Sequence, residues 1–163
     1  MAVFIQRVSN KKIAASIIIG LIISCVGLPG LSFSTAPDVL ALIIFYWAML
    51  GGDNRPRLGT VFLLGLIVDF LGGQIIGLHA LKYLFLVAVA VKFDNRFRMS
   101  ARLNRVAFVI ATFVALEAIL YGLVASYVGA FMDINQLVMV AAWCITWPFL
   151  EFIIEKNYAR VDK

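Results

Sequence analysis

Charged residues are scarce in this chain. Asp, Glu, Lys and Arg make up 14% of its 163 residues, whereas 63% are hydrophobic and the mean hydropathy is +1.00. Soluble globular domains are typically about 25% charged and about 45–50% apolar. The chain therefore has too little polar surface to face water on all sides, and its composition predicts an integral membrane protein.

Residues that build metal centres and nucleophilic sites are also few. His79 is the only histidine, and Cys25 and Cys144 each lie in an apolar run without a cysteine partner nearby. Zinc sites and Ser–His–Asp or Cys–His sets need several such residues, and no glycine-rich phosphate-binding motif is present. The sequence thus predicts a protein that is not an enzyme, holds no metal or cofactor, and has two free buried thiols.

The apolar residues form long runs, as in helical membrane spans, and not the alternating pattern of a membrane β-barrel. A helix needs about 20 apolar residues to cross the hydrocarbon core. The runs predict an all-α polytopic bundle of six transmembrane helices in one membrane domain, residues 1–163. The expected spans are approximately residues 13–33, 39–50, 58–73, 75–91, 106–132 and 137–154.

Two of these spans have unusual ends. The second is the shortest, and it would approach spanning length only by adding Ala36 to Asp38 before it and Gly51 to Gly52 after it. The third and fourth are separated by Gly73–Gly77, which could form a tight turn or a re-entrant segment.

The basic residues indicate an orientation. Thirteen of the fourteen Lys and Arg residues precede the first span, follow the last, or lie between spans two and three or spans four and five. Cytoplasmic loops are enriched in these residues, so both termini are expected in the cytoplasm. The first apolar run is too long for the core of a signal peptide, which favours a retained span.

The longest basic stretch, Lys92–Arg105, is expected to form a cytoplasmic loop. Together with the N-terminal basic residues it could contact anionic lipid, since each Lys or Arg near an anionic leaflet contributes about 1 kcal/mol. A contact with a cytoplasmic protein is the alternative. Because the positive charge follows the span boundaries, nucleic acid is not an expected partner.

Three ionisable side chains, Asp69, Lys82 and Glu117, are expected at similar depth near the middle of the bilayer. An unpaired charge there costs about 2.5–3.5 kcal/mol on insertion scales. One hypothesis is a buried cluster in which Lys82 offsets Asp69, Glu117 or both. The alternative is that Lys82 extends to the outer surface and each acid is protonated or hydrogen-bonded to a neighbour.

Small residues surround Asp69. Gly65, Asp69 and Gly72 share one helix face by their i, i+4, i+7 spacing, and Gly73 and Gly77 add a GxxxG spacing beyond them. Such faces let helices approach closely. The pattern favours a helix contact seam, with the border of a small-molecule cavity as the alternative.

Other polar and aromatic residues are expected in ordinary membrane positions. His79, at the start of the fourth span, is expected to be an interfacial polar residue and not a ligand. Tyr46 and Trp47, like Trp143 and Trp147, are expected near span ends or at protein contacts, where membrane proteins concentrate these side chains.

Several short motifs follow one another in a characteristic order. They are Pro37-Asp38, Tyr46-Trp47, Gly59, Gly65-Leu66, Asp69, Gly72, Gly77-Leu78-His79-Ala80-Leu81 and, near the C-terminus, Trp147-Pro148. In this order the sequence resembles the bacterial rod shape-determining protein family MreD. The resemblance is densest from Pro37 to Leu81.

The resemblance implies a non-enzymatic inner-membrane component of the cell-elongation complex, which helps maintain rod shape and regulate sidewall peptidoglycan synthesis. The implied partners are MreC and, indirectly, MreB, RodA and its penicillin-binding transpeptidase. On this resemblance Asp69 is expected to fix a helix arrangement that MreC recognises. Glu117 matches no family motif, and its candidacy rests on depth alone.

The resemblance also implies a fold similar to the substrate-binding S-component of energy-coupling-factor transporters. An alternative function is therefore a vitamin-binding membrane subunit of such a transporter. The sequence offers few polar side chains to line a cavity for such a ligand, which needs several convergent donors and acceptors.

Overall fold

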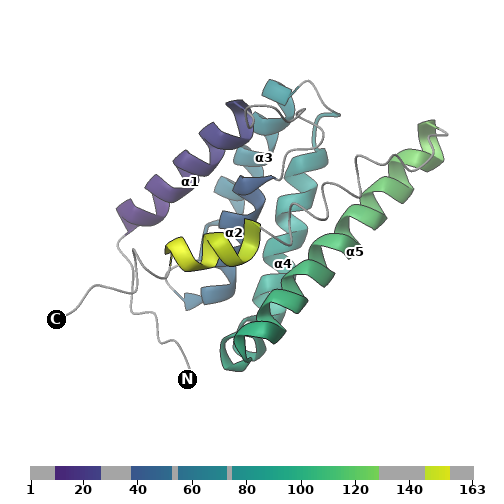
Figure 1. Cartoon of the computed structure of the whole chain (residues 1–163). Coiled ribbons are helices and arrows are strands. Elements are labelled where there is room, and N and C mark those ends of the chain that lie inside the picture. Colours follow the sequence, from purple (N-terminus) through teal and green to yellow (C-terminus); the bar gives the residue numbers. More distant parts are fainter. Residues whose placement is uncertain (1–9, 27–37, 53–54, 73–74, 129–145, 155–163) are drawn as a thin grey trace.

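The computed structural model describes residues 10–26, 38–52, 55–72, 75–128 and 146–154, and within these ranges all regular structure is helical. The labelled helices are α1 (Asn10–Val26), α2 (Val39–Leu50), α3 (Leu58–Gly72), α4 (Leu78–Met99) and α5 (Arg102–Val128). A further helix at residues 146–154, the C-terminal helix, lies beside α2 (Figure 1). The predicted all-helical class agrees with these elements.

Helix α2 has the bounds that its apolar run predicts, and it does not lengthen at either end. Asp38 is the N-cap of α2: its side chain accepts a hydrogen bond from the Ala41 backbone nitrogen at 3.0 Å, so the helix begins after it. Gly51 ends the helix with a φ of 67°, a value that favours glycine. The suggested extension through Asp38 and through Gly51 to Gly52 is therefore wrong, while Ala36 lies outside the described residues.

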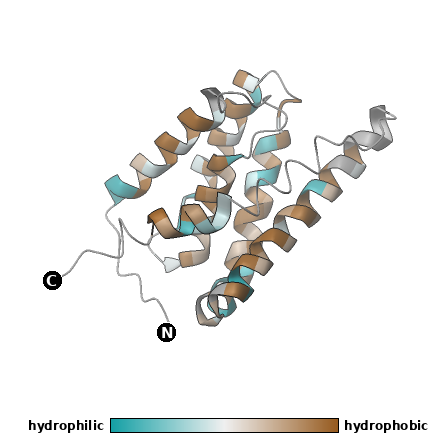
Figure 2. Ribbon diagram, viewed as in Figure 1, coloured by the Kyte–Doolittle hydropathy of each residue, from teal (hydrophilic) through white to brown (hydrophobic). Residues whose placement is uncertain are grey.

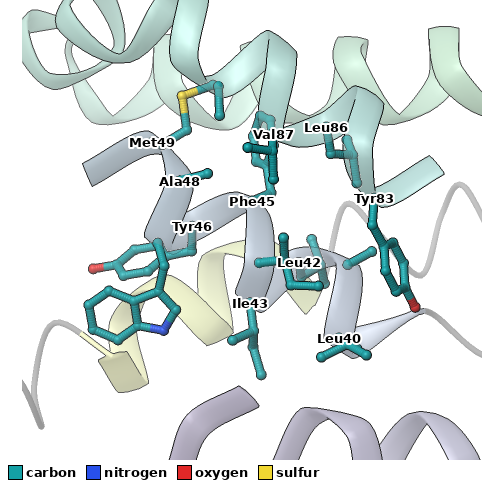
Figure 3. Packing of buried hydrophobic residues seen from close by; sticks show 14 of the residues in the cluster. Leu40, Leu42, Ile43, Phe45, Tyr46, Ala48, Met49, Tyr83, Leu86 and Val87 are labelled. Atoms are coloured by element: carbon teal, nitrogen blue, oxygen red, sulfur yellow. The ribbon is translucent and has the colours of Figure 1, made fainter. Parts of the chain in front are cut away.

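Helix α2 lies at the centre of the described bundle. Every side chain from Leu40 to Met49 is buried, and the helix packs closely against α1 and α4. Figure 3 shows Leu42 and Phe45 of α2 beside Tyr83, Leu86 and Val87 of α4. The 12 residues of α2 span about 18 Å, less than the hydrocarbon thickness of about 30 Å. Its length need not match the bilayer, because other helices surround it.

The basic stretch Lys92–Arg105 is a helical hairpin, so the predicted loop is wrong. Helix α4 continues to Met99, and α5 begins after only Ser100 and Ala101. The stretch is helical because two of its aromatic side chains, Phe93 and Phe97, pack against Phe108 of α5. The Phe108 ring lies 5.4 Å from the Phe93 ring and 6.2 Å from the Phe97 ring. From this turn α4 and α5 diverge (Figure 1).

Hydrophobic residues make up much of every labelled helix (Figure 2), and many large apolar side chains are exposed. Helix α3 exposes six of them: Leu58, Phe62, Leu63, Ile67, Phe70 and Leu71. Exposed patches of this kind mark contact with lipid or with other proteins. Within the described residues one helix is long and apolar enough to cross a membrane, at Leu103–Leu120 of α5, and α2 and α3 are apolar but shorter. The six-span topology with both termini in the cytoplasm stays a prediction.

The aromatic residues of the sequence motifs form part of the core. Trp47 and Trp147 are fully buried and Tyr46 is nearly so. The Trp147 ring lies 6.0 Å from the Phe45 ring and 6.1 Å from the Tyr46 ring, so it joins the C-terminal helix to α2. These side chains occupy protein contacts, one of the two kinds of position expected for them, while Trp143 lies outside the described residues.

Candidate functional site

Buried polar groups gather around the first turns of α4. They form two adjoining sets, which we call the Asp69 cap (Asp69, Gly77 and His79) and the Lys82 cluster (Ser24, Asp38, Lys82, Tyr83 and Glu117). The sets meet where the rings of His79 and Tyr83 lie 6.0 Å apart in an edge-to-face arrangement. Together they connect α4 to α1, α2, α3 and α5.

The Asp69 cap fastens α3 to the start of α4. Gly77 is the N-cap residue of α4 and supplies no side chain to cap the helix. The Asp69 carboxylate, fully buried on α3, accepts hydrogen bonds from the backbone nitrogens of Gly77 at 2.8 Å and His79 at 3.0 Å. Helix N-termini leave such donors unpaired and favour negative charge. Asp69 therefore caps α4 from a neighbouring helix.

The His79 side chain belongs to the same cap. Its Nδ1 lies 2.7 Å from Asp69 Oδ1, and the side chain is only 14% exposed. The carboxylate thus holds both the backbone and the ring of His79. His79 is thus engaged within the protein, while its expected position at the level of the membrane interface stays a prediction.

Gly65 brings α3 and α4 into close contact beside the cap. A Cβ atom added to Gly65 would lie 2.5 Å from the Ala80 backbone nitrogen and 2.9 Å from the His79 carbonyl carbon. Only a residue without a side chain fits there. This contact supports the helix seam expected from the small residues. Gly72, half-buried, is the last residue of α3.

Gly77 has a different role from the one that its spacing suggests. It lies in the turn before α4 with a φ of 98°, in the left-handed region that favours glycine. Gly77 is therefore a turn residue, so it does not form a GxxxG helix face, and Gly73 lies outside the described residues. The turn at residues 75–77 also delays the start of the fourth helix to Leu78.

The Lys82 cluster is a buried arrangement of two acids and one base. Lys82 Nζ lies 2.5 Å from Glu117 Oε1 on α5 and 3.7 Å from Asp38 Oδ2 before α2. Lys82 is only 4% exposed, so it does not extend to the outer surface. Of the acids expected near it, Glu117 is a partner. The second acid beside Lys82 is Asp38, and not Asp69 as the sequence had suggested.

The other carboxylate oxygen of Asp38, Oδ1, contacts residues of α1, α2 and α4. Oδ1 accepts hydrogen bonds from the Ala41 backbone nitrogen and from the Tyr83 hydroxyl, both at 3.0 Å, and Ser24 Oγ of α1 lies 3.5 Å away. Sequence reasoning assigned no role to Ser24 or Tyr83. Ser and Tyr are common within apolar helices, so neither gave a signal in the sequence.

A second buried ion pair holds the C-terminal helix. Arg105, near the start of α5, lies 3.1 Å from Glu151, which is 1% exposed. Sequence reasoning missed Glu151. The signal was an acid within the sixth apolar run, which is the kind of observation that singled out Glu117.

The remaining motif residues divide between the core and the undescribed segments. Trp147 packs in the core, Pro148 follows it half-buried in the C-terminal helix, and Pro37 lies outside the described residues. The buried acids, His79 and Lys82 are engaged with one another and with helix ends. Such an arrangement can hold helices in register.

One comparison with known proteins gives a match. A family model described as rod shape-determining protein MreD matches residues 7–155. No curated protein and no solved structure matches the chain. The match covers both polar sets, the central helix α2 and the C-terminal helix, and the chain belongs to the MreD family of rod shape-determining membrane proteins.

Proposed function

We propose that this chain is a non-enzymatic component of the bacterial cell-elongation complex in the inner membrane. In this role it binds MreC and so supports sidewall peptidoglycan synthesis by RodA and its transpeptidase, with MreB as an indirect partner. The observation that carries the proposal is the family match over residues 7–155. Six spans with both termini in the cytoplasm are part of the same proposal.

The two polar sets suit a scaffold that presents a fixed surface to a partner. The Asp69 cap fixes α3 against α4, and the Lys82 cluster connects α4 to α2 and α5. A helix arrangement held by buried hydrogen bonds loses less conformational freedom when a partner binds, which favours affinity. We therefore expect Asp69 to act on MreC binding through the positions of α3 and α4.

The hairpin between α4 and α5 suits a contact with anionic lipid at the cytoplasmic surface. Lys92 and Arg96 are exposed on it, whereas its acid Asp94 is paired with Arg55 at 3.2 Å. The exposed charge on this face is therefore positive. Each such residue contributes about 1 kcal/mol near an anionic leaflet.

The alternative, a vitamin-binding transporter subunit, has less support. A ligand of that kind needs several polar side chains directed into a cavity. The polar side chains around the start of α4, which are Asp69, His79, Asp38, Lys82 and Glu117, are each engaged in contacts within the protein.

Co-purification tests the proposed partner. The tagged full-length chain is expressed with MreC from the same genome, and MreC retention in mild detergent is measured. We expect wild type and a Gly59→Ala control to retain MreC, because an added Cβ at Gly59 meets no atom within 4 Å. Asp69→Ala is expected to retain less. Loss of MreC from wild type and control alike would contradict the proposal.

A further inference from the structure

The Lys82 cluster carries an unbalanced charge inside the protein. With its groups ionised it holds two carboxylates, Asp38 and Glu117, against one ammonium, and so has one negative charge in excess. The Asp38 and Lys82 side chains are 8% and 6% exposed. A charge without a partner in an apolar interior is costly. Taking up one proton would make the cluster neutral.

The geometry gives Lys82 two alternative partners. Its ammonium now contacts Glu117 at 2.5 Å and stands 3.7 Å from Asp38 Oδ2, which is buried and accepts no hydrogen bond from the described residues. Asp38 Oδ2 is thus a second acceptor within a short side-chain movement of Lys82. Asp38 and Glu117 lie on different elements, so a change of partner would alter which element Lys82 holds.

Glu117 is the more exposed of the two acids. Its side chain is 26% exposed and Lys82 holds it. Asp38 is less exposed, and its Oδ1 already accepts hydrogen bonds from the Ala41 nitrogen and the Tyr83 hydroxyl. Asp38 is therefore the acid more fully enclosed by neighbouring groups.

Helix α5 is the element that such an exchange would release. In the described part the closely packed pairs are α3 with α4, α2 with α4, α1 with α2 and α1 with α3. Helix α5 meets the bundle through buried apolar side chains, such as Val109 and Phe113, and through the Lys82–Glu117 contact. Helices α4 and α5 diverge from their shared turn (Figure 1). The Lys82–Glu117 contact joins them far from that turn.

We infer that the Lys82 cluster is a proton-binding latch for α5. When Glu117 is ionised, Lys82 binds it and holds α5 against α4. When a proton neutralises Glu117, the ammonium moves to Asp38 Oδ2, the Lys82–Asp38 pair is neutral, and α5 moves away. The surface that the chain offers to a partner then depends on pH.

Spin-label distances test this inference on the full chain in lipid nanodiscs. After Cys25 and Cys144 are replaced by serine, one label is placed at Leu81 on α4 and one at Ile119 on α5, both more than half exposed. We expect a longer distance to become populated as the pH falls from neutral to mildly acidic. A control pair at Leu81 and Leu63 on the tightly packed α3 should not change.

Two variants should shift this response in opposite directions. Glu117→Gln imitates the protonated acid and should show the long distance already at neutral pH. Asp38→Asn keeps an oxygen to cap α2 but removes the second partner of Lys82, so its distance should stay short at every pH. A wild-type distance that does not change with pH would overturn the inference, and so would an Asp38→Asn response equal to that of wild type. Both tests hold even if Glu117→Gln fails to fold.

His79 is the other titratable group near the cluster, since it lies beside Tyr83 and contacts Asp69. The His79→Asn variant should keep the pH response. Loss of the response in this variant would assign the proton to His79 and overturn the latch. The distances are measured on the isolated protein, so they are independent of whether MreC binds.

Discussion

Asp69 on α3 binds His79 on α4 twice, through the backbone nitrogen at 3.0 Å and the ring Nδ1 at 2.7 Å. Nine residues separate Asp69 from His79 in the sequence, among them the turn residue Gly77. The fully buried carboxylate therefore satisfies backbone nitrogens at the start of α4 from a neighbouring helix. This explains why an apolar helix carries an acid here.

Removing the Asp69 carboxylate should destabilise the α3–α4 corner. Asp69→Ala leaves the Gly77 and His79 nitrogens without their acceptor, at a cost of about 1–3 kcal/mol for each buried unsatisfied group. Asp69→Asn retains one oxygen and should lose less. Thermal unfolding in detergent measures the difference. In cells, normal shape with Asp69→Ala at matched protein level would contradict a functional role for this acid.

The contact at Gly65 should tolerate no side chain. Gly65→Ala places a Cβ against the Ala80 backbone, and overpacking of this kind typically costs about 1–3 kcal/mol. Gly59→Ala, on the same helix but without neighbours within 4 Å, should be neutral or slightly stabilising because alanine favours helix. Equal unfolding temperatures for the two variants would argue against the close seam.

Trp147 should anchor the C-terminal helix. Trp147→Ala empties a site among Phe45, Tyr46 and Phe97, and truncating a buried aromatic residue costs about 3–5 kcal/mol. Phe149→Ala is the matched control, because Phe149 is 65% exposed two residues away. Limited proteolysis should cut the C-terminal helix faster in Trp147→Ala only. Similar rates in both variants would count against the anchor.

The Arg105–Glu151 pair should be coupled in a double-mutant cycle. Breaking a buried pair by removing one partner costs about 3–5 kcal/mol, so Glu151→Ala should lower the unfolding temperature clearly. The double variant Arg105→Met/Glu151→Met should cost less than the sum of its two single changes. Each single change leaves one buried charge without its partner, whereas the double change removes both charges. Additive losses would show that the two side chains do not interact.

The bounds of α2 could be predicted because local chemistry decides them. A continuous apolar run lies between Asp38, a good N-cap, and Gly51, which takes a positive φ. The helical hairpin at Lys92–Arg105 was missed because charge suggested a loop. The spacing of Phe93, Phe97 and Phe108, which gives it an apolar face, was the signal that charge obscured.

The ionic contacts could be predicted only in part. The depth argument correctly selected Lys82 and Glu117, since both lie on long helices that share a turn. It could not select Asp38, whose position depends on α2 being short and central. Asp69 was at a suitable depth, but the unpaired nitrogens at the start of α4 bind it instead.

Conditional depletion in the native host, expected to be a rod-shaped bacterium, tests the central claim most directly. Cell shape and the insertion of labelled peptidoglycan along the sidewall are imaged as the protein disappears, with the wild-type chain supplied in trans as control. The account predicts rounded cells that lose sidewall insertion and recover with the wild-type chain. Depleted cells that stay rod-shaped with normal sidewall insertion would contradict it.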